Sequence, residues 1–201
     1  MTLGRRPLGA LALILGVTSA VVVYGCGGTV ATPVVPSPPV SSIQCGVERW
    51  PVKTLSDPNA SRVDYFNIST TTISALNALT AHCSGLPESR TYSEEFRVFE
   101  VEGVVLLTRN EDDKDVHIAL ADPADASKSI VVEVVEPSCA TTSPFLVMLT
   151  NAKAQYQAAG SLSGRHVRVR GVGFYDFAHG QTGRSASCIE LHPVLNITPI
   201  Q

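Results

Sequence analysis

Short apolar runs rich in β-branched residues alternate with polar turns over the second half of the chain, and this pattern predicts a mainly β domain. Five runs have the length and composition of strands: 96–107, 116–121, 129–135, 166–175 and 188–197. In the fourth run, Val167 and Val169 alternate with polar residues, so the two valines are expected to point into a core.

One helix is expected between the third and fourth strands. The pair Ser143-Pro144 precedes the segment 145–159 and Gly160 follows it, and such residues mark the ends of helices. The order is therefore three strands, a helix and two strands. This is the order of the OB-fold, a five-stranded Greek-key barrel whose helix lies between strands three and four. We predict an OB-like β-barrel over residues 91–201.

Residues 44–90 give a mixed pattern and are predicted to form a short N-terminal extension that packs on the barrel. Segment 49–54 looks extended and 56–59 has turn residues. Segment 72–82 has apolar residues at helical spacing, which predicts a short helix.

The start of the chain has the pattern of a secretory signal peptide. Arg5 and Arg6 precede an apolar run over 8–24 that stops at small residues around Cys26. The residues before Cys26 resemble the lipobox of bacterial lipoproteins, so we predict a signal peptide over 1–25 and lipidation of Cys26. An uncleaved membrane anchor is the alternative, although the run is short for a span of about 18 or more apolar residues. A twin-arginine export signal is less favoured because the rest of that pattern is missing.

Residues 26–43 are rich in proline and carry no charge, which predicts an extended tether between a membrane and the folded domain. Gly27 after the cysteine resembles lipoproteins that move to an outer membrane. We therefore expect an exported protein, lipid-anchored to the cell envelope at the outer membrane or cell surface.

Four cysteines remain after Cys26 is assigned to lipid, and the exported compartment permits disulfides. They are Cys45, Cys83, Cys139 and Cys188. Three pairings are possible, and proximity in sequence favours Cys45 with Cys83 and Cys139 with Cys188. Zinc binding by these thiols is the less favoured alternative, because no two of them have the close spacing of a zinc knuckle.

The charge of the mature chain is mildly acidic. The whole chain carries a net charge of −3. Removing residues 1–25 takes away two arginines and no acid, so the net charge becomes −5. This charge argues against binding of nucleic acid, which depends on many lysine and arginine contacts to phosphates.

Three polar motifs lie at predicted strand ends: Asp-x-His at 115–117, Gly-x-Gly-Phe-x-Asp-x-x-His-Gly at 171–180 and Glu-Leu-His-Pro-Val at 190–194. With the segment 49–54, they resemble an uncharacterised bacterial family, and the resemblance extends from about residue 49 to 197. What the resemblance implies is an OB-like barrel.

These motifs supply imidazoles and carboxylates, the ligands that zinc and similar divalent ions prefer. The candidate metal ligands are His117, His179, Glu190 and His192, with Glu133 and Asp176 in the same set. A metal with an open position would activate water for hydrolysis, for example of a phosphodiester. The favoured alternative is structural: turn carboxylates and histidines that hydrogen-bond the backbone, and an acidic hairpin turn at 111–115 that faces solvent.

A second set of residues suggests ligand binding on a barrel face: Arg168, Arg170, Tyr175, Asp176 and His179. We therefore expect a tethered binding or envelope-associated module that recognises a small molecule, a glycan or a protein. A metal-dependent hydrolase is the alternative, and a purely structural role in the envelope is the third.

Overall fold

The computed structural model describes residues 44–46 and 48–200. The predicted signal peptide at 1–25, the lipidation site Cys26 and the tether at 26–43 therefore lie outside the described residues. Over the described part of the chain, no helix combines the length and the apolar character that crossing a bilayer requires.

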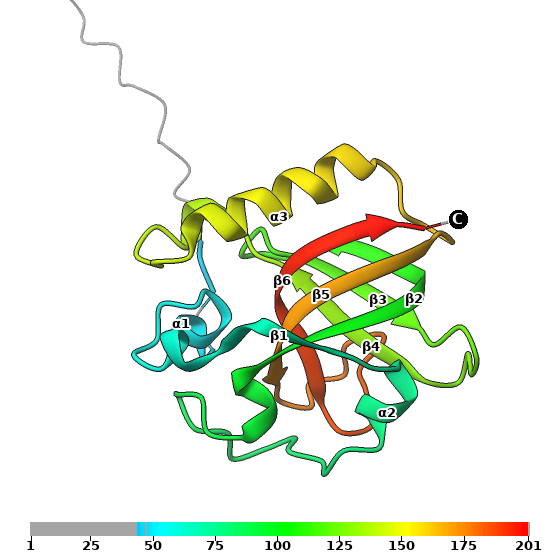
Figure 1. Cartoon of the computed structure of the whole chain (residues 1–201), viewed down its shortest axis with the longest axis horizontal. Helices are drawn as coiled ribbons and strands as arrows, with labels where there is room; N and C mark the ends of the chain where they lie inside the picture. The colour runs from blue at the N-terminus through cyan, green and yellow to red at the C-terminus, as the bar shows by residue number, and fades with distance from the viewer. Residues whose placement is uncertain (1–43, 47, 201) are drawn as a thin grey trace, which may run out of the picture. The chain divides into compact units, whose positions relative to one another are not determined.

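Five strands form a closed barrel, drawn from green to red in Figure 1. They are β2 (Arg97–Asn110), β3 (Val116–Ala121), β4 (Ser129–Val134), β5 (His166–Tyr175) and β6 (Ile189–Pro199). Their order is β2-β3-β4-β6-β5, and β5 pairs back with β2 to close the sheet. The β4–β6 pair is parallel and the other pairs of the barrel are antiparallel. The OB-like β-barrel is confirmed, with strand bounds within three residues of those expected.

Helix α3 (Leu146–Ala159) lies between β4 and β5 in the chain and runs along one side of the barrel beside β6 (Figure 1). It begins after Phe145, whose backbone N–H donates to the Ser143 hydroxyl at 3.1 Å. It ends at Gly160, which has a positive φ of 66°. A residue without a Cβ takes this conformation at little cost, so the glycine ends the helix where the sequence predicts.

The N-terminal extension differs from the prediction in detail. Segment 49–54 is not extended: it contains the helix α1 (Trp50–Lys53), which has a proline in its first turn. The predicted helix at 72–82 is only α2 (Ile73–Asn77), capped by Thr72. The sequence analysis also missed β1 (Asp64–Thr70), which pairs in parallel with β2 outside the barrel. Three short 3₁₀ helices complete the elements: η1 (Ala60–Arg62), η2 (Ser93–Phe96) and η3 (Pro137–Cys139).

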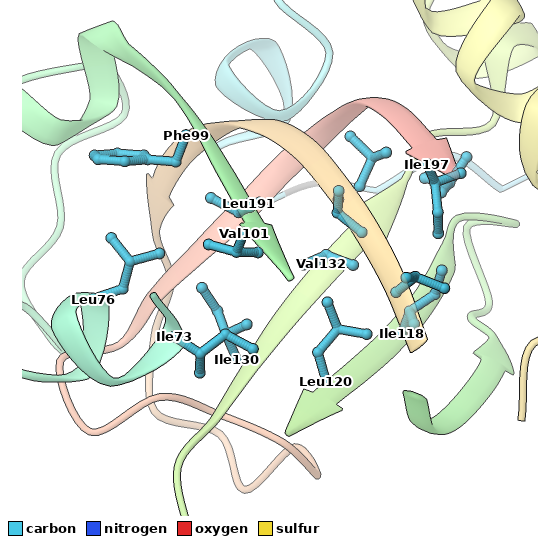
Figure 2. Close-up of a cluster of buried hydrophobic side chains, with 14 of the residues drawn as sticks. Ile73, Leu76, Phe99, Val101, Ile118, Leu120, Ile130, Val132, Leu191 and Ile197 are labelled. Carbon is cyan, nitrogen blue, oxygen red and sulfur yellow. The ribbon is translucent and has the colours of Figure 1, made fainter. Parts of the chain in front are cut away.

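Alternate residues of each strand fill the barrel with apolar side chains. Figure 2 shows Ile118 and Leu120 of β3 opposite Ile130 and Val132 of β4, with Leu191 of β6 above them. The helix α2 adds Ile73 and Leu76 to this cluster. A second cluster lies between the outside of the barrel and α3, with Leu55, Val98, Leu149 and Val172 among its members.

Two disulfides join the extension to the barrel, and the pairing favoured from the sequence is wrong. Cys45 bonds Cys139 with Cα atoms 5.5 Å apart, and Cys83 bonds Cys188 with Cα atoms 5.3 Å apart. Proximity in sequence fails here because the extension lies over the barrel, so that each of its cysteines meets a cysteine about a hundred residues later. Both bonds are of the kind that forms in an oxidising location.

Candidate functional site

Polar side chains collect on the outer face of the barrel where β3, β4 and β6 lie side by side. His117 of β3 stands directly opposite Glu133 of β4, and Val132 of β4 pairs with Leu191 of β6. The next residue along β6 is His192, whose Nδ1 lies 3.0 Å from Glu133 Oε2. Inward positions on these strands are apolar, so the pleat places the polar residues outside the barrel.

Two segments cover this face. One is the start of the extension, held by the Cys45–Cys139 disulfide and by Trp50, whose Nε1 donates to the carbonyl of Cys139 at 3.3 Å. The other is the β5–β6 loop, which packs so close to β3 at Gly183 that a Cβ there would lie 2.4 Å from the Ala119 Cβ. Gly183 also has a φ of 89°, so two independent reasons require glycine.

A pocket of about 500 Å³ remains between the two covering segments and the strands. Its lining includes six carboxylates: Glu48, Glu111, Asp112, Asp113, Glu133 and Asp176. The cationic or titratable nitrogens in the lining belong to Lys53, Arg109, His117 and His179. Negative charge is therefore in excess, which favours a cationic ligand.

His117 is held in one orientation inside this pocket. Its Nε2 lies 2.9 Å from the backbone carbonyl of Thr182. Because a carbonyl oxygen only accepts, Nε2 carries the hydrogen. Its Nδ1 therefore faces Glu133 Oε1 at 3.0 Å and Glu111 Oε1 at 3.6 Å. A bare nitrogen lone pair facing two carboxylates would be repelled, so this nitrogen holds either a proton or a cation.

The pKa of His117 agrees with that arrangement. Burial favours the neutral ring, but hydrogen bonds to Glu133 and to the Thr182 carbonyl outweigh burial and raise the pKa of His117. The ring thus holds a proton more tightly than a free imidazole when the pocket is empty.

Glu111 lies close to His117 and Glu133 because of the acidic turn at 111–115, which was expected to face solvent. The backbone N–H of Glu111 donates to the carbonyl of Asp115 at 2.9 Å, and Lys114 turns the chain with a φ of 72°. Arg109 donates through Nη2 to Glu111 Oε1 at 2.7 Å and orients the carboxylate. The tight turn brings Glu111 back over β3, and Asp112 and Asp113 of the same turn also line the pocket.

His192 lies deeper, fully buried between two carboxylates. Its Nε2 is 3.4 Å from Asp115 Oδ2 and its Nδ1 is 3.0 Å from Glu133 Oε2, and neither contact has hydrogen-bond geometry. Burial favours the neutral ring, but the charge of Glu133 and the contacts with Asp115 and Glu133 raise the pKa of His192 to about 9. The same imidazolium helps to lower the pKa of Glu133, although burial acts in the opposite direction.

Glu190 is also buried, and its Oε1 accepts from Gln181 Nε2 at 3.0 Å. Burial, together with the nearby charges of Asp176 and Glu133, raises the pKa of Glu190 to about 8. Glu190 is therefore neutral near pH 7. Its side chain is buried beneath the pocket and does not belong to the lining.

His179 forms a separate group in the same pocket. Its Nε2 lies 2.9 Å from Asp176 Oδ2. A carboxylate oxygen of Glu48 lies close to both side chains, so these three residues form a further candidate metal-binding group. The side chain of His179 is 52 % exposed and that of Asp176 is 5 % exposed. The four metal candidates from the sequence thus fall into distinct places: His117 and His179 line the pocket, whereas His192 and Glu190 lie beneath it.

The ligand-binding candidates are divided as well. Arg168 and Arg170 stand opposite Glu102 and Glu100 on β2 and form ion pairs with them, away from the pocket. Tyr175 is buried, with its ring centroid 5.2 Å from that of Tyr92. Of the five candidates, the structure brings Asp176 and His179 together in the pocket.

Sequence reasoning missed several contributors to this pocket. Lys53 and Glu48 come from the extension, and the Thr182 carbonyl is a backbone group that no side-chain pattern reveals. Glu111 was recognised only as one acid in a charged turn. Its position could have been predicted from its spacing of six residues from His117, because a tight turn lies between the two residues.

The chain matches no protein-family model and no curated protein sequence. The geometry of the pocket therefore carries the functional argument, and the family resemblance stays a prediction.

Proposed function

We propose that this protein is an exported, membrane-tethered binding module whose pocket takes up a divalent transition-metal ion. The observation that carries the proposal is His117, whose Nε2 is engaged by a backbone carbonyl while its Nδ1 faces two carboxylates. Histidines that bind metal commonly donate the other ring N–H to a carbonyl or carboxylate, which fixes the tautomer and the ring.

The ligand set consists of His117 Nδ1, Glu111 and Glu133, with one ligand atom from each lying within 4.8 Å of the others. Imidazole with carboxylates suits zinc and its neighbours in the first transition row better than calcium or magnesium, which prefer oxygen ligands alone. The ion would take the place of the proton on Nδ1. A bound ion with three protein ligands keeps a position for a small molecule, a glycan or an acidic group of a protein.

Location is part of the proposal. The two disulfides support an oxidising compartment, and the predicted signal peptide and Cys26 support a lipid anchor. Metabolic labelling with a palmitate analogue tests the anchor. We expect label on the wild-type chain and none on Cys26→Ser, and label that persists in the variant contradicts lipidation at this residue.

The metal proposal is tested on the fragment 41–201, which contains the closed barrel and both disulfides. The tag-free fragment is titrated with zinc by calorimetry, and its metal content is measured by mass spectrometry. We expect about one equivalent on the triad. Glu111→Gln should weaken binding at least about tenfold. Its side chain is 30 % exposed, and the urea unfolding midpoint of the variant checks that its fold is kept.

His166→Ala is the matched control, because His166 lies on β5 outside the pocket lining. It should leave zinc binding unchanged. Absence of saturable binding by the wild-type fragment, or equal binding by wild type and Glu111→Gln, overturns the proposal.

A metal-dependent hydrolase is the second candidate, favoured by one observation. Lys53 lines the same pocket as the proposed metal ligands, so the pocket would also offer a cationic amine to an anionic group. Nearby carboxylates raise the pKa of Lys53 although burial opposes this, so the amine is charged. It would hold an anionic group, such as a phosphodiester, while the metal polarises it. Hydrolysis of bis-p-nitrophenyl phosphate by the zinc-loaded fragment, lost in Lys53→Met, is expected for this function and not for a binding module.

A further inference from the structure

A second pocket lies where β1, β6 and the start of α3 meet. Its volume is about 480 Å³, which is within the usual range of about 300 to 1,000 Å³ for small-molecule sites. Its walls are aromatic and aliphatic: Tyr65 and Phe66 from β1, Phe145 and Met148 at the start of α3, and Leu195 from β6. The rings of Tyr65 and Phe145 form one wall, with centroids 4.7 Å apart.

Phe66 is 99 % exposed although it borders this apolar pocket. Scattered apolar residues on a surface are ordinary, but an aromatic side chain at the mouth of an apolar cavity gains buried area only when something occupies the cavity. Every other ring in the lining is at least partly buried. Phe66 is therefore placed to close over a ligand.

One charged residue, Arg170, stands at the rim. Its Nε donates to Glu100 of β2, and within the described residues its two terminal guanidinium nitrogens donate to no protein group. Such a free pair of nitrogens matches the two oxygens of a carboxylate. Asn196, which pairs with Arg170 across β5 and β6, lies beside it in the lining.

From this arrangement we infer that the pocket bounded by Phe66, Phe145 and Met148 binds a single-chain fatty acid, its acyl chain among the apolar walls and its carboxylate on Arg170. This site is independent of the proposed metal pocket and shares no lining residue with it. The apolar lining selects a hydrocarbon body, and the one cation at the rim selects an anionic head group in preference to a neutral one.

Met148 makes the test direct. The whole chain has two methionines, Met1 and Met148, so the fragment 41–201 retains only the one in the pocket. The fragment is labelled with ¹³C at the methionine methyl group and titrated with decanoate while the methyl resonance is followed. We expect a saturable shift. Decanol, which has the same chain and no charge, should bind at least about tenfold more weakly.

Two arginine variants form a matched pair. Arg170→Gln should weaken decanoate binding about tenfold, since a hydrogen-bonded charge is lost. Arg168→Gln is the control, because Arg168 lies on the same strand in a similar ion pair and outside this lining. Phe66→Ala should also weaken binding, and because Phe66 is 99 % exposed the substitution removes no core packing.

Two results overturn the inference. One is the absence of a saturable Met148 shift with decanoate. The other is equal binding of decanoate and decanol with no effect of Arg170→Gln, which would remove the role of the head group.

Discussion

Two outer faces of this barrel pair carboxylates with cationic side chains across neighbouring strands, in opposite surroundings. On the covered face, Glu133 contacts His117 and His192 beneath the extension and the β5–β6 loop, and His192 and Asp115 are 0 % exposed. On the exposed face, Arg168 contacts Glu102 across β5 and β2 with side chains 47 % and 43 % exposed. Both faces pair a carboxylate with a basic side chain across neighbouring strands, and they differ in how far water reaches the pair.

The comparison shows that burial beneath other segments of the chain, more than residue type, distinguishes a charge pair in a candidate site from an ordinary surface ion pair. An exposed pair is screened and contributes little to stability or selectivity. A covered pair holds its charges in a low dielectric, where a missing partner is costly and a pKa moves far from its ordinary value. The pKa of His192 rises to about 9 and that of Glu190 to about 8 for this reason.

The largest expected effect of a substitution on stability comes from removing a carboxylate on the covered face, compared with the same change on the exposed face. Glu133→Gln leaves the buried His192 with only Asp115 as a counter-charge, and we expect a loss of about 3 to 5 kcal/mol in the free energy of unfolding. Glu102→Gln should cost below about 1 kcal/mol. Urea unfolding of the metal-free fragment measures both, and equal small losses would contradict the distinction between the faces.

The second prediction concerns pH. A raised pKa of His192 means that the folded state holds the proton more tightly, so the stability this gives is present below about 6.5 and lost as pH rises through about 9. Glu190 acts with the same sign, because the folded state keeps a proton that the unfolded state has released above pH 4.5. Each group should contribute a loss of up to about 3 kcal/mol between pH 6 and pH 9, so together the free energy of unfolding should fall by on the order of 5 kcal/mol.

Glu190→Gln sharpens this pH test, since an amide imitates the protonated carboxyl at every pH. The variant should lose less stability than wild type on going to pH 9. Denaturant midpoints measured at pH 6, 7.5 and 9 decide it, and a flat wild-type profile argues against charged burial on this face.

Acid should weaken metal binding on the covered face. Since the pKa of His117 is raised, a proton competes with the metal for Nδ1 already near neutral pH. Zinc affinity should drop about tenfold for each pH unit below that pKa. Calorimetric titrations at pH 7.5 and 5.5 measure the drop, and an affinity independent of pH would exclude His117 as a ligand.

The smallest effect is expected on the exposed face. A double-mutant cycle on Arg168 and Glu102 should give a small coupling energy that largely disappears in about 1 M sodium chloride, because salt screens exposed charges. Urea unfolding at low and high salt measures the coupling. A large coupling that persists in about 1 M salt would show that burial does not distinguish the two faces.

The five barrel strands, the helix α3 and the barrel class follow from the sequence, because each depends on local pattern. Alternating valines at 167 and 169 specify a strand with one buried face, and Gly160 takes the positive φ at which α3 ends. The prediction for the segment 49–54 was wrong because it relied on local pattern alone. Its local pattern looks extended, whereas Pro51 in the first turn and the burial of Val52 favour a helix.

The sequence by itself determined the presence of four disulfide cysteines and a set of histidines and carboxylates at strand ends. Only the tertiary structure decided which cysteines pair and which of those polar residues meet in a pocket. Both depend on how the extension and the β5–β6 loop lie across the barrel, which sets contacts between residues about a hundred positions apart. No local pattern encodes such contacts, because they arise when separate apolar surfaces are buried against each other.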